Sequence, residues 1–115
     1  MYVNYFTFKE FIKTDTSLDN SVTSSTYLAN LACLWDYLNN LREKLGSPIY
    51  INSAYRTPAV NKQVGGAKRS LHMQGRAVDI RTKPEYMSKL RCLLAQNKDD
   101  LSELIDYGTF FHIAI

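Results

Sequence analysis

Three residues of this sequence are candidates to ligate one metal ion together: His72, Asp79 and His112. The chain has no other histidine, and Asp79 stands between Val78 and Ile80 in a run that is otherwise apolar. Because an isolated buried carboxylate is costly, such an aspartate is usually ion-paired or bound to a metal. Two imidazoles and one carboxylate are a ligand set of catalytic zinc sites, which leave a fourth position open for water. The alternative for each histidine alone is a structural hydrogen-bonding role.

Two predicted strands must position the aspartate and the second histidine. Residues 77–81 alternate as a strand, and residues 104–115 are typical of a hairpin that turns near Gly108. Side chains alternate between the two faces of a strand. Asp79 and His112 can therefore converge if their strands are neighbours in one sheet.

The remaining pattern predicts helices around this sheet. Apolar residues recur at steps of three and four from Thr26 until Gly46 ends the pattern, and Thr57 with Pro58 is typical of a helix start. The further predicted elements are a strand at 49–52 and helices at 58–64 and 82–96. At this length the elements predict a single α+β domain over residues 1–115.

Composition and charge argue against several classes of protein. The net charge of +3 comes without a long basic stripe or recognition motif, so no nucleic-acid partner is expected. No run approaches the roughly 20 apolar residues of a membrane span, and the start of the chain lacks a signal-peptide pattern. We therefore expect a soluble monomer, cytoplasmic as synthesised, without a membrane partner. Cys33 and Cys92 lie in leucine-rich helical segments, where small buried side chains are expected rather than disulfides or a fourth metal ligand.

Three segments carry a resemblance to a known family. They read Ser-Ala-Tyr-Arg at 53–56, Asn-Lys-Gln-Val-Gly-Gly at 61–66 and Ser-Leu-His-Met-Gln-Gly-Arg-Ala-Val-Asp-Ile at 70–80. The chain resembles the zinc D-Ala-D-Ala carboxypeptidase family. That family shares the Hedgehog-type peptidase fold with vancomycin-resistance dipeptidases and with phage endolysins that cut peptidoglycan stem peptides. The resemblance implies a small antiparallel sheet flanked by helices.

The resemblance also implies roles for particular residues. The family's zinc ligands, a histidine, an aspartate seven residues later and a histidine in a late strand, fall on His72, Asp79 and His112. Its arginine that contacts a substrate carboxylate or carbonyl falls on Arg56, and its serine that supports the substrate falls on Ser70. An arginine suits the first role because its planar guanidinium binds a carboxylate through two hydrogen bonds.

The general base is the point where the sequence departs from its relatives. Relatives carry an acidic residue three or six positions before the last histidine, and here position 109 is threonine. Asp106, six residues before His112, is therefore the expected base, with Glu103 in reserve. We expect Asp106 to face back toward His112 from before the turn and Glu103 to lie farther out. The alternative is that Asp106 is only a turn residue.

The function implied by the resemblance is hydrolysis of a peptide bond in a bacterial peptidoglycan stem peptide, with Zn²⁺ as the cofactor. Carboxypeptidase and endopeptidase specificities both remain open. A phage or prophage origin would explain how a chain without an export signal reaches the cell wall. A zinc-containing binding module of the same fold, without efficient catalysis, is the second hypothesis, because the acid at position 109 is missing.

Overall fold

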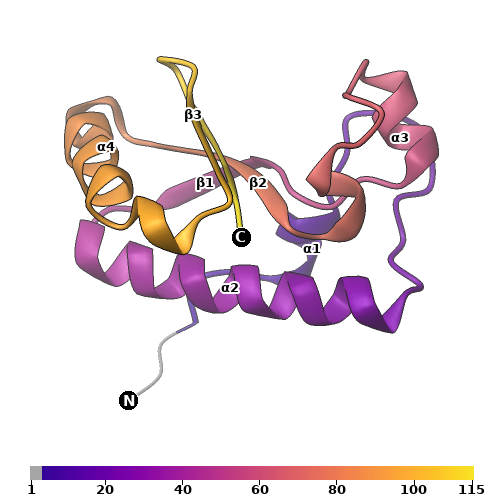
Figure 1. The fold of residues 1–115 in the computed structure, drawn as a ribbon, viewed down its shortest axis with the longest axis horizontal. Coiled ribbons are helices and arrows are strands. Elements are labelled where there is room, and N and C mark those ends of the chain that lie inside the picture. Colours follow the sequence, from indigo (N-terminus) through magenta and orange to yellow (C-terminus); the bar gives the residue numbers. More distant parts are fainter. Residues whose placement is uncertain (1–3) are drawn as a thin grey trace.

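The computed structural model describes residues 4–115 and contains a four-stranded antiparallel sheet with helices around it. The strand order is β1-β2-β4-β3, so β4 is paired on both sides. Figure 1 shows α2 running along one side of the sheet, with α4 and α3 at opposite ends and the β3–β4 hairpin rising away from α2. The elements are α1 (Phe8–Ile12), α2 (Ser25–Leu45), β1 (Ile49–Ser53), α3 (Pro58–Gln63), β2 (Ala77–Thr82), α4 (Met87–Gln96), β3 (Glu103–Asp106) and β4 (Phe111–Ala114). This is the α+β architecture that the sequence predicted.

Helix α2 is the main support of the sheet. Its start is capped by Ser24, whose side chain accepts a hydrogen bond from the backbone N–H of Tyr27, and its end is followed by Gly46. One face of the helix is buried, namely Leu31, Leu34, Leu38, Leu41 and Leu45. Although α2 has 21 residues, no helix within residues 4–115 is long and apolar enough to cross a membrane.

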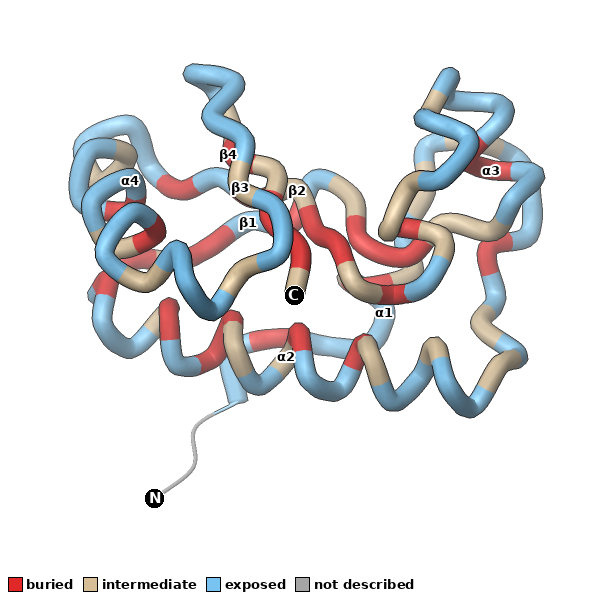
Figure 2. The backbone as a smooth tube through the Cα atoms, in the orientation of Figure 1, coloured by how far each residue is buried: buried red, intermediate tan, exposed pale blue. Residues whose placement is uncertain are grey.

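The core lies between this leucine face and one face of the sheet, and Figure 2 shows buried residues in both layers. The sheet contributes buried apolar side chains from three strands, which are Ile49, Ile51, Val78, Ile80, Phe111 and Ile113. Because side chains alternate along a strand, Asp79 between Val78 and Ile80 must point to the other face. The hydrophobic core thus fixes which sheet face can carry polar chemistry.

The expected helix at 82–96 begins later than predicted. Strand β2 runs through Thr82, a short 3₁₀ turn follows at Pro84–Tyr86, and α4 begins at Met87. The Thr82 hydroxyl is buried and donates a 2.7 Å hydrogen bond to the Pro48 carbonyl, which holds the residue in the sheet. A proline at position 84 also disfavours helical geometry in the residue before it. These two local effects outweigh the helical pattern at its start.

The expected burial of the cysteines is wrong. Cys33 and Cys92 are both exposed and free. Each lies on a helix that buries leucines on a different side, such as Leu31 and Leu34 in α2 and Leu90 and Leu94 in α4. A leucine-rich neighbourhood in sequence therefore does not place a residue on the inward face of its helix.

Candidate metal centre

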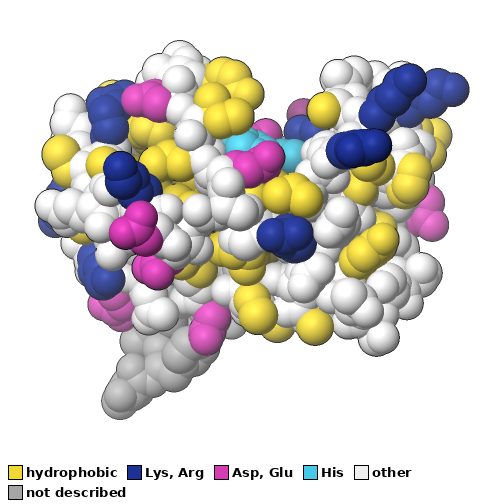
Figure 3. Space-filling model, viewed as in Figure 1, with side chains coloured by type: hydrophobic (Ala, Val, Ile, Leu, Met, Phe, Trp, Pro, Cys, Tyr) yellow, Lys and Arg dark blue, Asp and Glu magenta, His cyan; other side chains and the backbone are white. Residues whose placement is uncertain are grey.

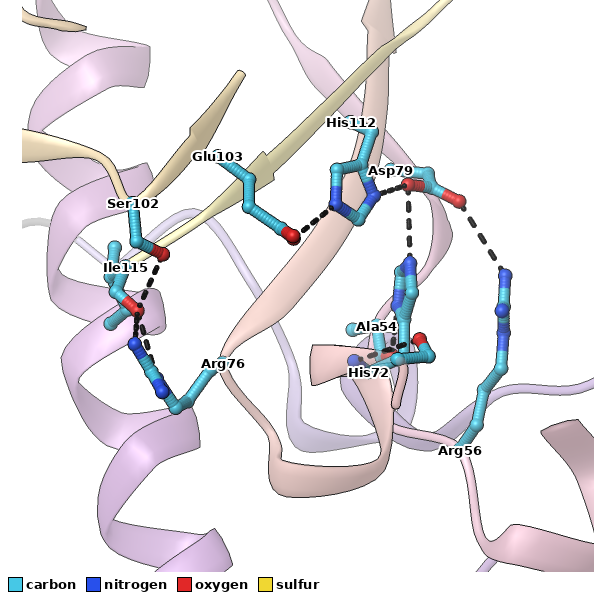
Figure 4. Close-up of polar contacts among 10 residues, drawn as sticks. Ala54, Arg56, His72, Arg76, Asp79, Ser102, Glu103, His112 and Ile115 are labelled. Atoms are coloured by element: carbon cyan, nitrogen blue, oxygen red, sulfur yellow. Dashed lines mark hydrogen bonds and ion pairs between the residues drawn. The ribbon is translucent and has the colours of Figure 1, made fainter. Parts of the chain in front are cut away.

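The pairing of β2 with β4 places Asp79 directly opposite His112. His112 Nδ1 lies 2.9 Å from Asp79 Oδ1, and Figure 4 shows the two side chains pointing toward each other. The convergence of these two residues that strand alternation predicted is therefore observed. Both side chains are mostly buried, each with 14% of its surface exposed.

His72 reaches the same carboxylate from a 3₁₀ turn at Leu71–Gln74. Ser70 caps that turn, because its Oγ accepts a hydrogen bond from the backbone N–H of His72. His72 Nδ1 lies 2.6 Å from the Ala54 carbonyl oxygen, and Nε2 lies 3.2 Å from Asp79 Oδ1. Three candidate ligands from a 3₁₀ turn and two strands thus meet at one point.

The turn that carries His72 packs closely against the first turns of α2. It ends at Gly75, which has a φ of 71° and therefore favours glycine. A Cβ at this position would lie 2.7 Å from the Tyr27 carbonyl oxygen of α2, so the approach also excludes a side chain. The Asn30 side chain adds a 2.8 Å hydrogen bond to the Gln74 carbonyl. The long helix therefore positions His72 as well as supporting the sheet.

The contacts of the two histidines need more positive charge than two neutral imidazoles supply. The Ala54 carbonyl only accepts, so His72 Nδ1 carries the proton and the Nε2 of neutral His72 is bare. That bare nitrogen faces Asp79 Oδ1, which is also an acceptor. His112 contacts carboxylate oxygens through both nitrogens, at 2.9 Å to Asp79 and 2.8 Å to Glu103. Two neutral imidazoles carry only two protons for these four contacts, so extra protons or a metal ion must balance the cluster.

The ligand atoms of His72, Asp79 and His112 lie within 4.8 Å of one another, a grouping that could hold a metal ion. In each histidine the nitrogen turned away from Asp79 has its own acceptor, the Ala54 carbonyl for His72 and the Glu103 carboxylate for His112. Such outer contacts fix the orientation of metal-binding imidazoles. The residues therefore fit a metal ion in both their donor types and their supporting contacts.

The electrostatics of the cluster shift two pKa values in opposite directions. Burial alone would raise the pKa of Asp79, but its contacts with the imidazoles of His112 and His72 outweigh this effect and hold that pKa well below its usual range. The hydrogen bond to Asp79 raises the pKa of His112; burial opposes this shift and the contact with Glu103 adds to it. Asp79 is thus a carboxylate over the whole physiological range.

Arg56 is held beside the cluster by three acceptors. Its Nε donates to Ser53 Oγ at 3.1 Å, its Nη1 donates to Asn61 Oδ1 at 3.3 Å, and its Nη2 lies 3.5 Å from Asp79 Oδ2. Its backbone N–H also donates to the His72 carbonyl. The guanidinium is therefore oriented before any ligand arrives, and it is coupled to Asp79.

The two candidate bases have exchanged the expected positions: Glu103 is the one that lies beside His112. Glu103 Oε1 is 2.8 Å from His112 Nε2, whereas Asp106 forms a 2.6 Å ion pair with Arg91 of α4. The pairing of β3 with β4 places Ile105 opposite His112, so residues 103 and 105 share the face of His112 and residue 106 points to the other face. The expectation that Asp106 faces His112 while Glu103 lies farther out is wrong.

A cavity of about 360 Å³ opens above the cluster. The cluster and Arg56 line its floor, and the predicted substrate residue Ser70 and Glu103 also line it; Asp106 does not. Figure 3 shows the histidine side chains at the bottom of a notch, with hydrophobic side chains on one rim and Lys or Arg on the other. The structure thus brings together every predicted site residue except Asp106.

Two buried asparagines support the site without having been assigned a role from the sequence. Asn61 accepts from Arg56 and donates to the Ala67 carbonyl, and it belongs to a segment that carried the family resemblance. Asn20 donates to the carbonyls of Ile12 and Tyr55, and its oxygen accepts from the N–H of residue 57. The chain on both sides of Arg56 is therefore held by Asn20. Its position in a polar loop gave no signal of this.

Comparison with known proteins shows the family of the chain. Residues 4–114 match the peptidase M15 family, so the chain belongs to that family. A zinc D-Ala-D-Ala carboxypeptidase from Streptomyces albus G is 39% identical over 61 residues, which are 51% of this chain and 24% of that enzyme. The match thus spans about a quarter of the relative's length. The family that the sequence motifs predicted is confirmed.

Proposed function

We propose that this chain is a zinc-dependent peptidase that hydrolyses a peptide bond in bacterial peptidoglycan stem peptides. The observation that carries the proposal is the convergence of His72, Asp79 and His112 on the floor of a cavity, with each imidazole oriented by an outer acceptor. Membership of a peptidase family supports the reaction type, and the carboxypeptidase relative supports zinc and the substrate class.

In this proposal the three ligands hold Zn²⁺, which when bound supplies a Lewis acid that polarises a carbonyl and acidifies water. Arg56 binds the substrate. A guanidinium has five N–H donors, and the contacts with Ser53, Asn61 and Asp79 leave two of them for a substrate oxygen. Ser70 has its Oγ fixed by the N–H of His72, so its hydroxyl proton can be donated to the substrate.

We assign the proton transfer to Glu103 and not to Asp106. One carboxylate oxygen of Glu103 contacts His112, and the other makes no hydrogen bond within residues 4–115. Because Glu103 lines the cavity, its carboxylate is within reach of a substrate bound there. The carboxylate of Asp106 is occupied by Arg91 and by the N–H of Gly108.

A matched pair of substitutions tests this assignment. Glu103→Gln keeps an oxygen that can accept from His112 but cannot take up a proton, so zinc content should stay near one per chain while turnover falls by about 10²-fold or more. Asp106→Asn should leave both nearly unchanged. Zinc analysis and the rate on one synthetic stem peptide measure the two effects. An inactive Asp106→Asn protein beside an active Glu103→Gln protein would return the role to Asp106.

One observation favours a second candidate, a zinc-containing binding module without efficient catalysis. Glu103 contacts His112 in the way that carboxylates orient metal-binding histidines, and such a residue need not act as a base. Zinc-dependent binding of a stem peptide without any cleavage would support this candidate.

Mass analysis of the products distinguishes the two forms of the enzyme, a carboxypeptidase that removes a terminal residue and an endolysin-type endopeptidase that cuts within the peptide.

A further inference from the structure

The cavity above the metal cluster has two unlike walls. One is formed by the β3–β4 hairpin, through Ile105, Tyr107 and Phe110, and the other by the loop that contains Ala67 and Arg69. In Figure 3 the hydrophobic and the basic rims face each other across the notch that holds the histidines. A ligand that reaches the metal cluster must pass between these two walls.

The hairpin wall is a strip of side chains on the same face as His112. Residues 103, 105 and 107 alternate onto this face from one strand, and residues 110 and 112 do so from the other. The rings of Tyr107 and Phe110 are stacked, with centroids 4.7 Å apart and an angle of 18° between planes. Tyr107 is 55% exposed, and it lies outside the hydrophobic core. The hairpin thus presents a flat aromatic surface to the cavity.

The opposite wall carries a guanidinium without a protein partner. Within residues 4–115, Arg69 forms no hydrogen bond, ion pair or ring contact, and it lines the cavity. Every other arginine contacts a carboxylate, an oxygen acceptor or an aromatic ring, namely Arg42, Arg56, Arg76, Arg81 and Arg91. Arg69 therefore has all of its N–H donors available for a ligand.

The charge of the cavity indicates the sign of that ligand. Two lining cations, Arg56 and Arg69, balance the two lining carboxylates, Asp79 and Glu103. With the divalent zinc of the proposed function, the cavity carries a net positive charge. A cleft of one sign concentrates ligands of the opposite sign. The loaded site should therefore attract an acidic peptide.

We propose that the two walls select acidic peptides: a carboxylate of the peptide pairs with Arg69 while an apolar part packs against Tyr107 and Phe110. This inference rests on the proposed function and names its substrate class. The carboxylate that Arg69 binds is distinct from the oxygen that Arg56 contacts, so the preferred substrate carries an acidic side chain or a second free carboxylate. Arg69 is then a specificity-determining residue and takes no part in the chemistry.

Two synthetic stem peptides that differ only by Glu against Gln test the proposal. Calorimetry of their binding to the zinc-loaded Glu103→Gln protein, which should cleave them far more slowly, should show tighter binding of the acidic peptide by about tenfold or more. Arg69→Gln should abolish that difference without changing zinc content or binding of the neutral peptide. The preference should also weaken as salt is raised. Tyr107→Ala should weaken the binding of both peptides.

Lys68→Gln is the matched control, because it removes the same charge from a neighbouring residue that does not line this cavity. It should keep the preference. Equal binding of the two peptides by the protein with Arg69 intact would overturn the proposal. Loss of the preference for the acidic peptide in Lys68→Gln, as complete as in Arg69→Gln, would overturn it too. Binding is measured separately from cleavage, so a protein that prefers the acidic peptide but hydrolyses neither would contradict the proposed function alone.

Discussion

Substitution of Gly66 by alanine should destabilise the protein through Asn61. A Cβ at position 66 would overlap Asn61 Oδ1 and lie 2.7 Å from its Cγ. Asn61 is only 4% exposed, and its side chain is held by Arg56 and by the Ala67 carbonyl. It must therefore move, and both hydrogen bonds are lost or weakened.

The magnitude follows from two opposing effects. Loss of the contacts of a buried polar group costs about 1–3 kcal/mol. Replacing glycine by alanine stabilises by about 0.4–1 kcal/mol through the unfolded chain where the native conformation is compatible. The loss should dominate, with a net decrease of about 1–2 kcal/mol in the free energy of unfolding. For a domain of this size that is a decrease of roughly 4–10 °C in Tm.

Denaturant unfolding of the metal-free protein measures the effect, because bound metal would add its own stabilisation. A double-mutant cycle with Asn61→Ala isolates the cause. In the Asn61→Ala background the two overlapping atoms are gone, and the remaining close atom, Arg56 Nη1 at 3.1 Å, is at the end of a flexible side chain that can shift. Gly66→Ala should therefore be neutral or slightly stabilising there. Equal destabilisation by Gly66→Ala in both backgrounds would refute the steric explanation.

Three further predictions concern the site and its support. Arg56→Lys should keep zinc but lower kcat/KM at least tenfold, since an ammonium group cannot reproduce the planar, oriented guanidinium that faces the substrate. Steady-state kinetics and metal analysis measure the two effects, and full activity of the variant would contradict the prediction. Asn20→Ala should lower the free energy of unfolding by about 2 kcal/mol, because three hydrogen bonds of a buried side chain are lost; an unchanged denaturation midpoint would argue against it. The pKa of His112 is raised in the fold, so its contribution to the stability of the metal-free protein is present in full below about pH 6.5 and is lost as pH rises through the raised value. Unfolding measurements at several pH values should show this decline in stability. Zinc titrations should show affinity rising over the same pH interval, because zinc binding displaces a proton. Stability that does not change with pH would be inconsistent with the contact between His112 and Asp79.

The sheet face on which two of the three cluster residues lie could be predicted from the sequence, because the alternation of side chains along a strand is a local property. A carboxylate between Val78 and Ile80 must leave the apolar face of its strand, and the same parity puts His112 on the matching face of the last strand. His72 could be placed only by resemblance. Its position depends on contacts of its own turn with α2 and with the Ala54 carbonyl, and both of these partners are far from His72 in the sequence.

The choice between Glu103 and Asp106 was also within reach of the sequence, but the prediction relied on the spacing seen in relatives, six residues before the last histidine, and not on the alternation of side chains along the strand. A hairpin that turns at residues 107–110 places residue 105 opposite His112, which excludes residue 106 from that face. The partner of Asp106 could not have been predicted. Arg91 reaches it from α4, and its guanidinium also lies over the ring of Phe111.

The supporting asparagines show a limit of another kind. Asn20 lies in a polar loop and Asn61 in the short helix α3, and the residues around them did not indicate that these two polar side chains are buried. Their burial follows from tertiary packing, which brings backbone groups such as the Ala67 carbonyl within reach of their side chains. Roles of this type require coordinates.

The central claim is that metal at His72, Asp79 and His112 enables this chain to cleave stem peptides. Mass spectrometry of one defined stem peptide tests it most directly, after incubation with the native protein, the chelator-treated protein and the treated protein with one equivalent of zinc restored. We predict cleavage at a single bond by the native and the restored protein, none after chelation, and no restoration for His72→Ala. Cleavage that survives chelation, or an intact peptide in every sample, would contradict the claim.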